Sequence, residues 1–156
     1  MTYAKRALFT FFIPSLMVLV LAGCSLFVSP ERNLKRLTQG LQDKFERKDW
    51  KGAVAYMDPK MEYVLPQKKA SSNKGQKLAV AFVNETDFDD FMIHVKGSET
   101  ISDTKILIMT MVQFRKSDAT RTTNTFCKVN FVWEKKGDNW VITQWRQMGE
   151  KEMSSS

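Results

Sequence analysis

The stretch that decides the fold is residues 131–145, which read FVWEKKGDNWVITQW. Aromatic and β-branched residues stand on both sides of the segment KKGDN, whose Gly-Asp-Asn sequence is typical of a tight turn. A link this short joins neighbouring strands only when they run antiparallel. The stretch therefore predicts a β-hairpin.

The same two-residue periodicity runs from Asp89 to the C-terminal region. It is interrupted by GSETIS, SDAT and KKGDN, which are all rich in turn-forming residues. Because these links are short, consecutive strands should pair with each other in antiparallel fashion. We predict a four-stranded antiparallel sheet with strands at 90–97, 104–116, 121–135 and 139–148.

The segment before the strands has helical spacing. Leu34, Leu37, Leu41 and Phe45 lie three or four residues apart, which predicts an apolar stripe along one helix. Ser29-Pro30 is typical of a helix start, and the pattern ends near residue 48.

Shorter elements follow this helix. Asp49 is placed to cap a second helix that stops before Asp58-Pro59. Residues 61–65 alternate like a brief strand or extended link, and 67–76 form a polar loop. Residues 78–83 could form a short strand or a helix, and the spacing of Leu78 and Phe82 favours the helix. Helices followed by an antiparallel sheet indicate an α+β domain with the helices on one face of the sheet.

The N-terminus has the pattern of a secretory signal peptide. Lys5 and Arg6 precede the apolar run 7–22, which is short for a membrane-spanning helix and is interrupted by Pro14. Residues 21–24, Leu-Ala-Gly-Cys, then resemble the lipobox of bacterial lipoproteins. We expect a signal peptide over 1–23.

The lipobox resemblance implies that Cys24 becomes the new N-terminus and carries acyl chains, palmitate among them. Several chains would anchor the protein stably in a lipid bilayer, with 24–29 as a short tether. Ser25 resembles the sorting signal for the outer membrane, which implies a location in the bacterial envelope facing the periplasm. With Cys24 lipidated no internal disulfide can form, and we expect Cys127 to be a buried core residue.

Residues 30–148 resemble the nuclear transport factor 2-like superfamily, which includes ketosteroid isomerase. The features that carry the resemblance are the opening helix ending in KDWKGAVAYMDP, the later short helix and the closing hairpin. The resemblance implies N-terminal helices packed on a curved, cone-like, four-stranded antiparallel sheet. It leaves 149–156 as a C-terminal tail. The fold hosts enzymes, binding proteins and scaffolds alike, so it does not decide function.

Alternation assigns a face to each strand residue. The residues expected to face the helices are Phe91, Ile93, Val95, Ile106, Ile108, Val112, Phe114, Thr125, Cys127, Val129, Phe131, Trp133, Trp140 and Ile142. The opposite face keeps many apolar residues, and exposed apolar patches usually mark contacts. We expect a homodimer or envelope-protein interface there, formed by His94, Met109, Met111, Phe126 and Trp145. The alternative is that bulges change the register and bury some of these residues.

Few residues are candidates for chemistry. His94 is the only histidine, which excludes a metal site built from several histidines. Asp87, Asp89 and Asp90 read as solvated turn residues, with a weak calcium site as the alternative.

An isomerase-like site would need a buried acid or base beside a hydrogen-bond donor. The candidates for these two roles are Tyr56, Tyr63 and Asp103. No motif for a cofactor is present, and we expect none to be bound.

These observations favour a lipid-anchored, non-catalytic envelope domain that binds a partner protein or a small ligand. The formal net charge of +7 does not suggest nucleic acid for a protein outside the cytoplasm. Two alternatives stay open: a small-molecule enzyme of the isomerase or cyclase type that uses the cone pocket, and a structural assembly subunit.

Overall fold

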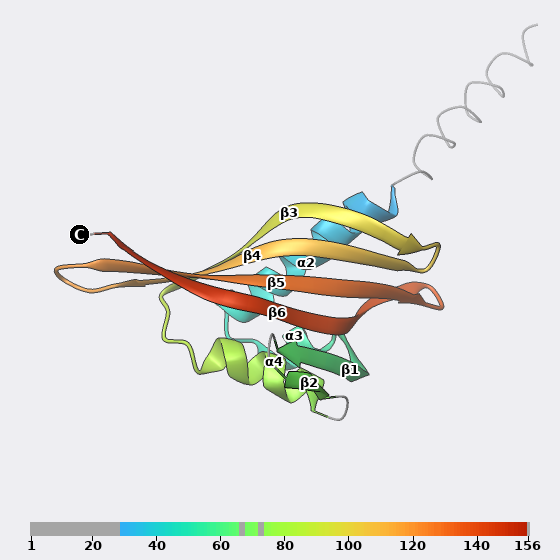
Figure 1. The fold of residues 1–156 in the computed structure, drawn as a ribbon, viewed down its shortest axis with the longest axis horizontal. Coiled ribbons are helices and arrows are strands. Elements are labelled where there is room, and N and C mark those ends of the chain that lie inside the picture. Colours follow the sequence, from blue (N-terminus) through green and yellow to red (C-terminus); the bar gives the residue numbers. More distant parts are fainter. Residues whose placement is uncertain (1–28, 66–67, 72–73, 156) are drawn as a thin grey trace, which may run out of the picture. The chain divides into compact units, whose positions relative to one another are not determined.

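The structure, a computed structural model, describes residues 29–65, 68–71 and 74–155 (Figure 1). The chain divides into two compact units, 1–33 and 34–156. The first unit is described only at its end, where Ser29 Oγ accepts a hydrogen bond from the Arg32 N–H at 3.3 Å. This contact caps the first turn of helix α2 (Pro30–Glu46). The second unit holds the sheet and the hydrophobic core.

The helices follow the sequence predictions closely. The buried side of α2 consists of Leu34, Thr38, Leu41 and Phe45, which confirms the apolar stripe apart from the half-buried Leu37. The second predicted helix is α3 (Trp50–Val54), which ends earlier than predicted because the residues from Met57 onward form a strand, and the third is α4 (Gly75–Asn84).

Asp49 caps α3 as predicted. Its Oδ1 accepts a hydrogen bond from the Gly52 N–H at 2.9 Å, and its Oδ2 lies 3.0 Å from Lys44 Nζ. The Gly52 hydrogen bond is the main reason why the pKa of Asp49 is lowered, and Lys44 adds to the effect. The charged carboxylate is therefore the form that holds the turn between α2 and α3.

The sheet is larger than predicted and is mixed. It has five long strands, β1 (Met57–Leu65), β3 (Asp90–Ser102), β4 (Lys105–Ser117), β5 (Thr122–Lys136) and β6 (Asn139–Ser155), and the four-residue β2 (Lys68–Ser71). The strand order is β2-β1-β6-β5-β4-β3. The predicted antiparallel meander is present as β3–β6. The prediction of a purely antiparallel sheet of four strands was wrong, because β1 and β2 extend the sheet and β1 runs parallel to β6.

The error has a physical cause in the pairing of β1. This strand runs parallel to β6, with Met57 opposite Ile142 and Tyr63 opposite Trp145. The partners are about 80 residues apart, and periodicity shows that a segment is extended but not what it pairs with. Strand β2 falls within the predicted loop at 67–76, and β6 continues through the predicted tail to Ser155.

Helix α2 lies behind β3–β6 in the view of Figure 1, while α3 and α4 lie near β1. The side of β3–β6 turned toward the helices carries the core. All the residues predicted to face the helices are buried there except Val95, Thr125 and Trp140, which are partly exposed. Cys127 is buried among them as predicted.

The structure contradicts the predicted position of Trp145 on the outer face of the sheet. Its side chain is 0% exposed, and its ring centroid lies 4.8 Å from that of Phe131 in the core. The cause is a β-bulge in β6: Ile142 is opposite Trp133, yet Gln144 is opposite Val132, so Thr143 is an extra residue. One extra residue inverts the alternation for the rest of the strand.

Candidate functional site

Aromatic rings fill the space between the helices and the sheet. Trp145 is at the centre of this cluster and contacts rings from α2, β1, α4 and β5. Phe91, Phe114 and Phe88 continue the cluster toward the other end of the sheet, with centroids 5.3–5.7 Å apart. Side chains therefore occupy the part of the interior around Trp145.

The three isomerase candidates lie in different surroundings. Tyr63 is 5% exposed, and its hydroxyl donates a hydrogen bond to Gln147 Oε1 at 2.6 Å. Tyr56 packs edge-on against Trp133, whereas Asp103 is exposed in the turn between β3 and β4. The structure does not bring Asp103 together with either tyrosine in a buried pair.

The acidic segment at 87–90 binds the end of β4. Lys116 Nζ lies 3.2 Å from Asp87 and 3.1 Å from Asp89, and Asp90 pairs with Arg115 at 3.3 Å. Asp89 also accepts a hydrogen bond from the Ser117 N–H at 2.7 Å, which is the main cause of its lowered pKa. In the described residues, His, Cys, Asp and Glu side chains form no group of three that could hold a metal ion.

The anchoring predictions concern residues that the structure does not describe. Cys24 and the signal peptide 1–23 lie outside the described ranges. Across residues 29–65, 68–71 and 74–155, no helix combines the length and the apolar character needed to cross a membrane.

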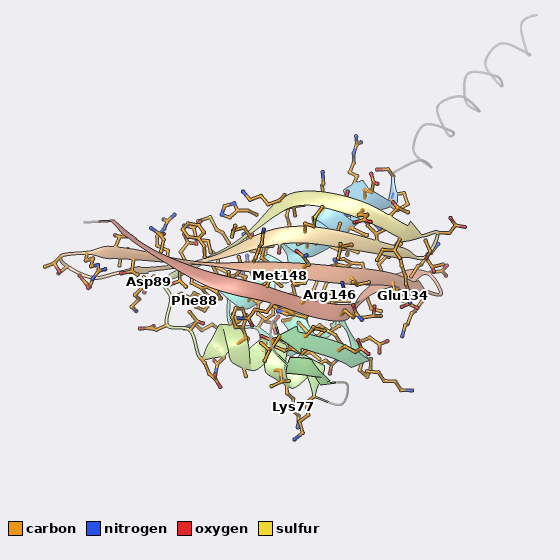
Figure 2. The ribbon with its side chains drawn as sticks, viewed as in Figure 1. Lys77, Phe88, Asp89, Glu134, Arg146 and Met148 are labelled. Carbon is orange, nitrogen blue, oxygen red and sulfur yellow. The ribbon has the colours of Figure 1, made fainter. Side chains whose placement is uncertain are left out.

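The outer face of the sheet carries a methionine patch, defined here as Met92, Met109, Met111 and Met148. Met109 is 36% exposed and Met148 is 56% exposed, and the other two are half-buried. Figure 2 shows Met148 along β6, on the side of the sheet that faces the viewer. Phe126 lies on the same face, since its neighbour Cys127 is buried in the core. Methionine adapts its shape to different partners, so such a patch suits binding.

A chain of polar side chains crosses three strands beside this patch. Gln113 Nε2 donates to Asn124 Oδ1 at 2.9 Å, and His94 Nε2 lies 2.9 Å from Gln113 Oε1. Because an amide oxygen can only accept, this arrangement requires His94 to carry a hydrogen on Nε2. His94 is therefore held in one orientation next to Met111, which lies directly opposite it on β4.

The outer-face prediction thus places four of its five residues correctly. His94, Met109, Met111 and Phe126 lie on that face, while Trp145 does not. Met148 was missed because simple alternation from Ile142 turns it toward the helices, whereas the bulge at Thr143 inverts the alternation and Met148 is itself the extra residue of a second bulge, between Gln147 and Gly149. Only the register of β6 against β5 reveals these shifts.

Sequence reasoning also missed a charged recess of about 230 Å³ near the start of β1. Its carboxylates are Asp58, Glu62 and Glu134, and Lys136 Nζ lies 2.5 Å from Asp58 Oδ2. The hydrogen bond from Lys136 is the largest cause of the lowered pKa of Asp58, which is 8% exposed. The residues come from two segments, 58–62 and 134–136, that are far apart in the sequence, and no spacing pattern connects these segments.

Comparisons with known proteins agree on the fold. No protein-family model and no curated protein sequence matches the chain. Among solved structures, it is similar to an NTF-2 like protein of unknown function from Shewanella oneidensis MR-1. The two share 13% identity with a TM-score of 0.61, over 76% of this chain and 98% of that one.

Two further structures show the range of proteins with this architecture. The CamKII hub homology domain of Chlamydamonas reinhardtii matches with a TM-score of 0.62 and 12% identity, over 76% of this chain and 97% of that one. A ketosteroid isomerase-like protein from Erwinia carotovora atroseptica matches with a TM-score of 0.57 and 14% identity, over 74% and 93%. The chain therefore has the α+β fold of the nuclear transport factor 2-like and ketosteroid isomerase-like proteins, with helices on a curved sheet.

Proposed function

We propose that the chain is a lipid-anchored module of a bacterial envelope that binds a second protein through the outer face of its sheet. The first partner to test is another copy of the same chain. The lipid anchor would be Cys24, in the outer membrane facing the periplasm, as the lipobox resemblance implies. The domain from residue 30 onward would then present its outer face to partners in the envelope.

The observation that carries this proposal is the methionine patch on the outer face of the sheet. Strands β3 and β4 carry Met92, Met109 and Met111 next to Phe126 of β5 and the fixed His94, and β6 carries Met148. Burying such apolar side chains against a partner is favourable at about 25 cal/mol per Å² of apolar surface.

Sedimentation velocity of the chain beginning at Ser25 tests this interface. Met109→Lys combined with Met111→Lys places two charges in the patch, which should weaken self-association at least tenfold, or about 1.4 kcal/mol. Leu78→Lys is the matched control, because Leu78 on α4 has the same 36% exposure as Met109. A wild-type chain that sediments as a monomer at all concentrations would contradict self-association. Equal association by the double variant and the control would contradict the patch.

A further inference from the structure

A groove of about 570 Å³ lies between α3 and α4, apart from the outer face of the sheet. We call it the α3–α4 groove. Its lining residues are Trp50, Lys51, Val54, Gln76, Lys77, Val80, Ala81 and Asn84. Its volume is within the range of small-molecule sites, about 300–1,000 Å³.

The walls of the groove are mainly apolar and held in place. Trp50 is half-exposed, and its ring lies 6.2 Å from that of Phe45, which fixes it at the start of α3. Gln76 Nε2 donates a hydrogen bond to Met57 O at 3.0 Å, which ties α4 to β1. Residues 76–84 extend along α4 for about 12 Å at 1.5 Å per residue. The wall that α4 contributes is therefore about as long as a medium-length alkyl chain.

The charge of the groove has one sign. Lys51 stands on α3 and Lys77 on α4, and the lining contains no acidic side chain. Within the described part of the chain neither lysine forms an ion pair, and the nearby Asp49 pairs with Lys44 instead. Figure 2 shows Lys77 extending from α4 away from the sheet into solvent. Both lysines are thus exposed residues of the groove lining whose charges no carboxylate of the described residues neutralises.

We propose that the α3–α4 groove binds a free fatty acid, with the alkyl chain along α4 and the carboxylate between Lys51 and Lys77. The alkyl chain matches the apolar walls, and the carboxylate matches the two lysines. Eight lining residues are few for a protein partner, because standard interfaces use about 20–30 residues on each side. A single-chain ligand fits a groove lined by one face of α4 and by Trp50, Lys51 and Val54 of α3.

Photolabelling of the full chain in phosphatidylcholine vesicles tests the proposal. The probe is a dodecanoic acid with a photoreactive group near the end of its chain, and the labelled peptides are identified by mass spectrometry. Excess dodecanoate should remove the label from peptides of α3 and α4, whereas dodecyltrimethylammonium, a cation of similar length, should not. Lys51→Glu with Lys77→Glu should reduce this labelling at least tenfold.

Two further variants make the result specific. Lys96→Glu reverses an exposed lysine on β3 and should leave the labelling within twofold of wild type. Ala81→Met fills the groove, keeps both lysines and should also reduce the labelling. The proposal is overturned if the label lies mainly on β3–β5, if the cationic competitor displaces it equally well, or if the double lysine variant is labelled like wild type. Circular dichroism of each variant verifies that it is folded.

Discussion

Replacing Trp145 with alanine tests the β-bulge at Thr143, which points the side chain of Trp145 into the core. A fully buried tryptophan removes about 200 Å² from water, which at 25 cal/mol per Å² corresponds to about 5 kcal/mol. Its indole Nε1 is buried without a hydrogen-bond partner among the described residues, which offsets about 1–2 kcal/mol of that gain. We expect Trp145→Ala to lower the free energy of unfolding by about 3–4 kcal/mol, within the usual range for such substitutions.

Urea denaturation followed by circular dichroism measures this change, with the free energy extrapolated to water. Trp140→Ala is the matched control, since Trp140 is on the same strand but only partly buried at the edge of the core. Trp140→Ala should lower the free energy of unfolding by about 1 kcal/mol. If both substitutions cost the same small amount, Trp145 faces outward as simple alternation predicts, and the proposed bulge is refuted.

Three other predictions follow from single contacts. Asp58→Asn should lower the free energy of unfolding at neutral pH, because it removes the ion pair with Lys136. Since Lys136 lowers the pKa of Asp58, the stability difference between wild type and variant should persist above pH 3.8, the ordinary pKa of an aspartate, and shrink below it. Urea midpoints measured at several pH values would show this. Equal differences at pH 3 and pH 7 would contradict the ion pair. Gly75→Ala should lower the free energy of unfolding by at least about 2 kcal/mol in the same assay, since a Cβ at this position would overlap the backbone oxygen of Met61. An unchanged free energy of unfolding would show that α4 does not pack this closely on β1. Cys24→Ala should abolish incorporation of labelled palmitate and release the chain from membranes, and label retained by this variant would exclude Cys24 as the lipid site.

Local patterns predicted the elements well. The apolar stripe of α2, the Asp49 cap and the hairpin at 131–145 all involve residues within a few positions of each other. Such contacts are governed by periodicity and turn chemistry, which a sequence displays directly. The same alternation placed His94 and Met109 on the outer face of the sheet.

Features that depend on distant pairing could not be predicted. The bulge at Thr143 is visible only from its register against β5, and the parallel pairing of β1 depends on a strand about 80 residues away. The α3–α4 groove has the same origin, because α3 and α4 become neighbours only through the packing of both around β1. The candidate sites are therefore less predictable than the elements that build them.

The position of β6 has a consequence for the order of folding. This last strand lies between β1 and β5, so it joins the first strand of the domain to the antiparallel strands β3–β5. Until its residues have been synthesised, β1 lacks its main neighbour and the rings around Trp145 have no centre. Contacts that span so much of the chain slow folding. We therefore expect β1 to join the sheet only after β6 has been synthesised, and deletion of β6 to prevent β1 and β3–β5 from forming one sheet.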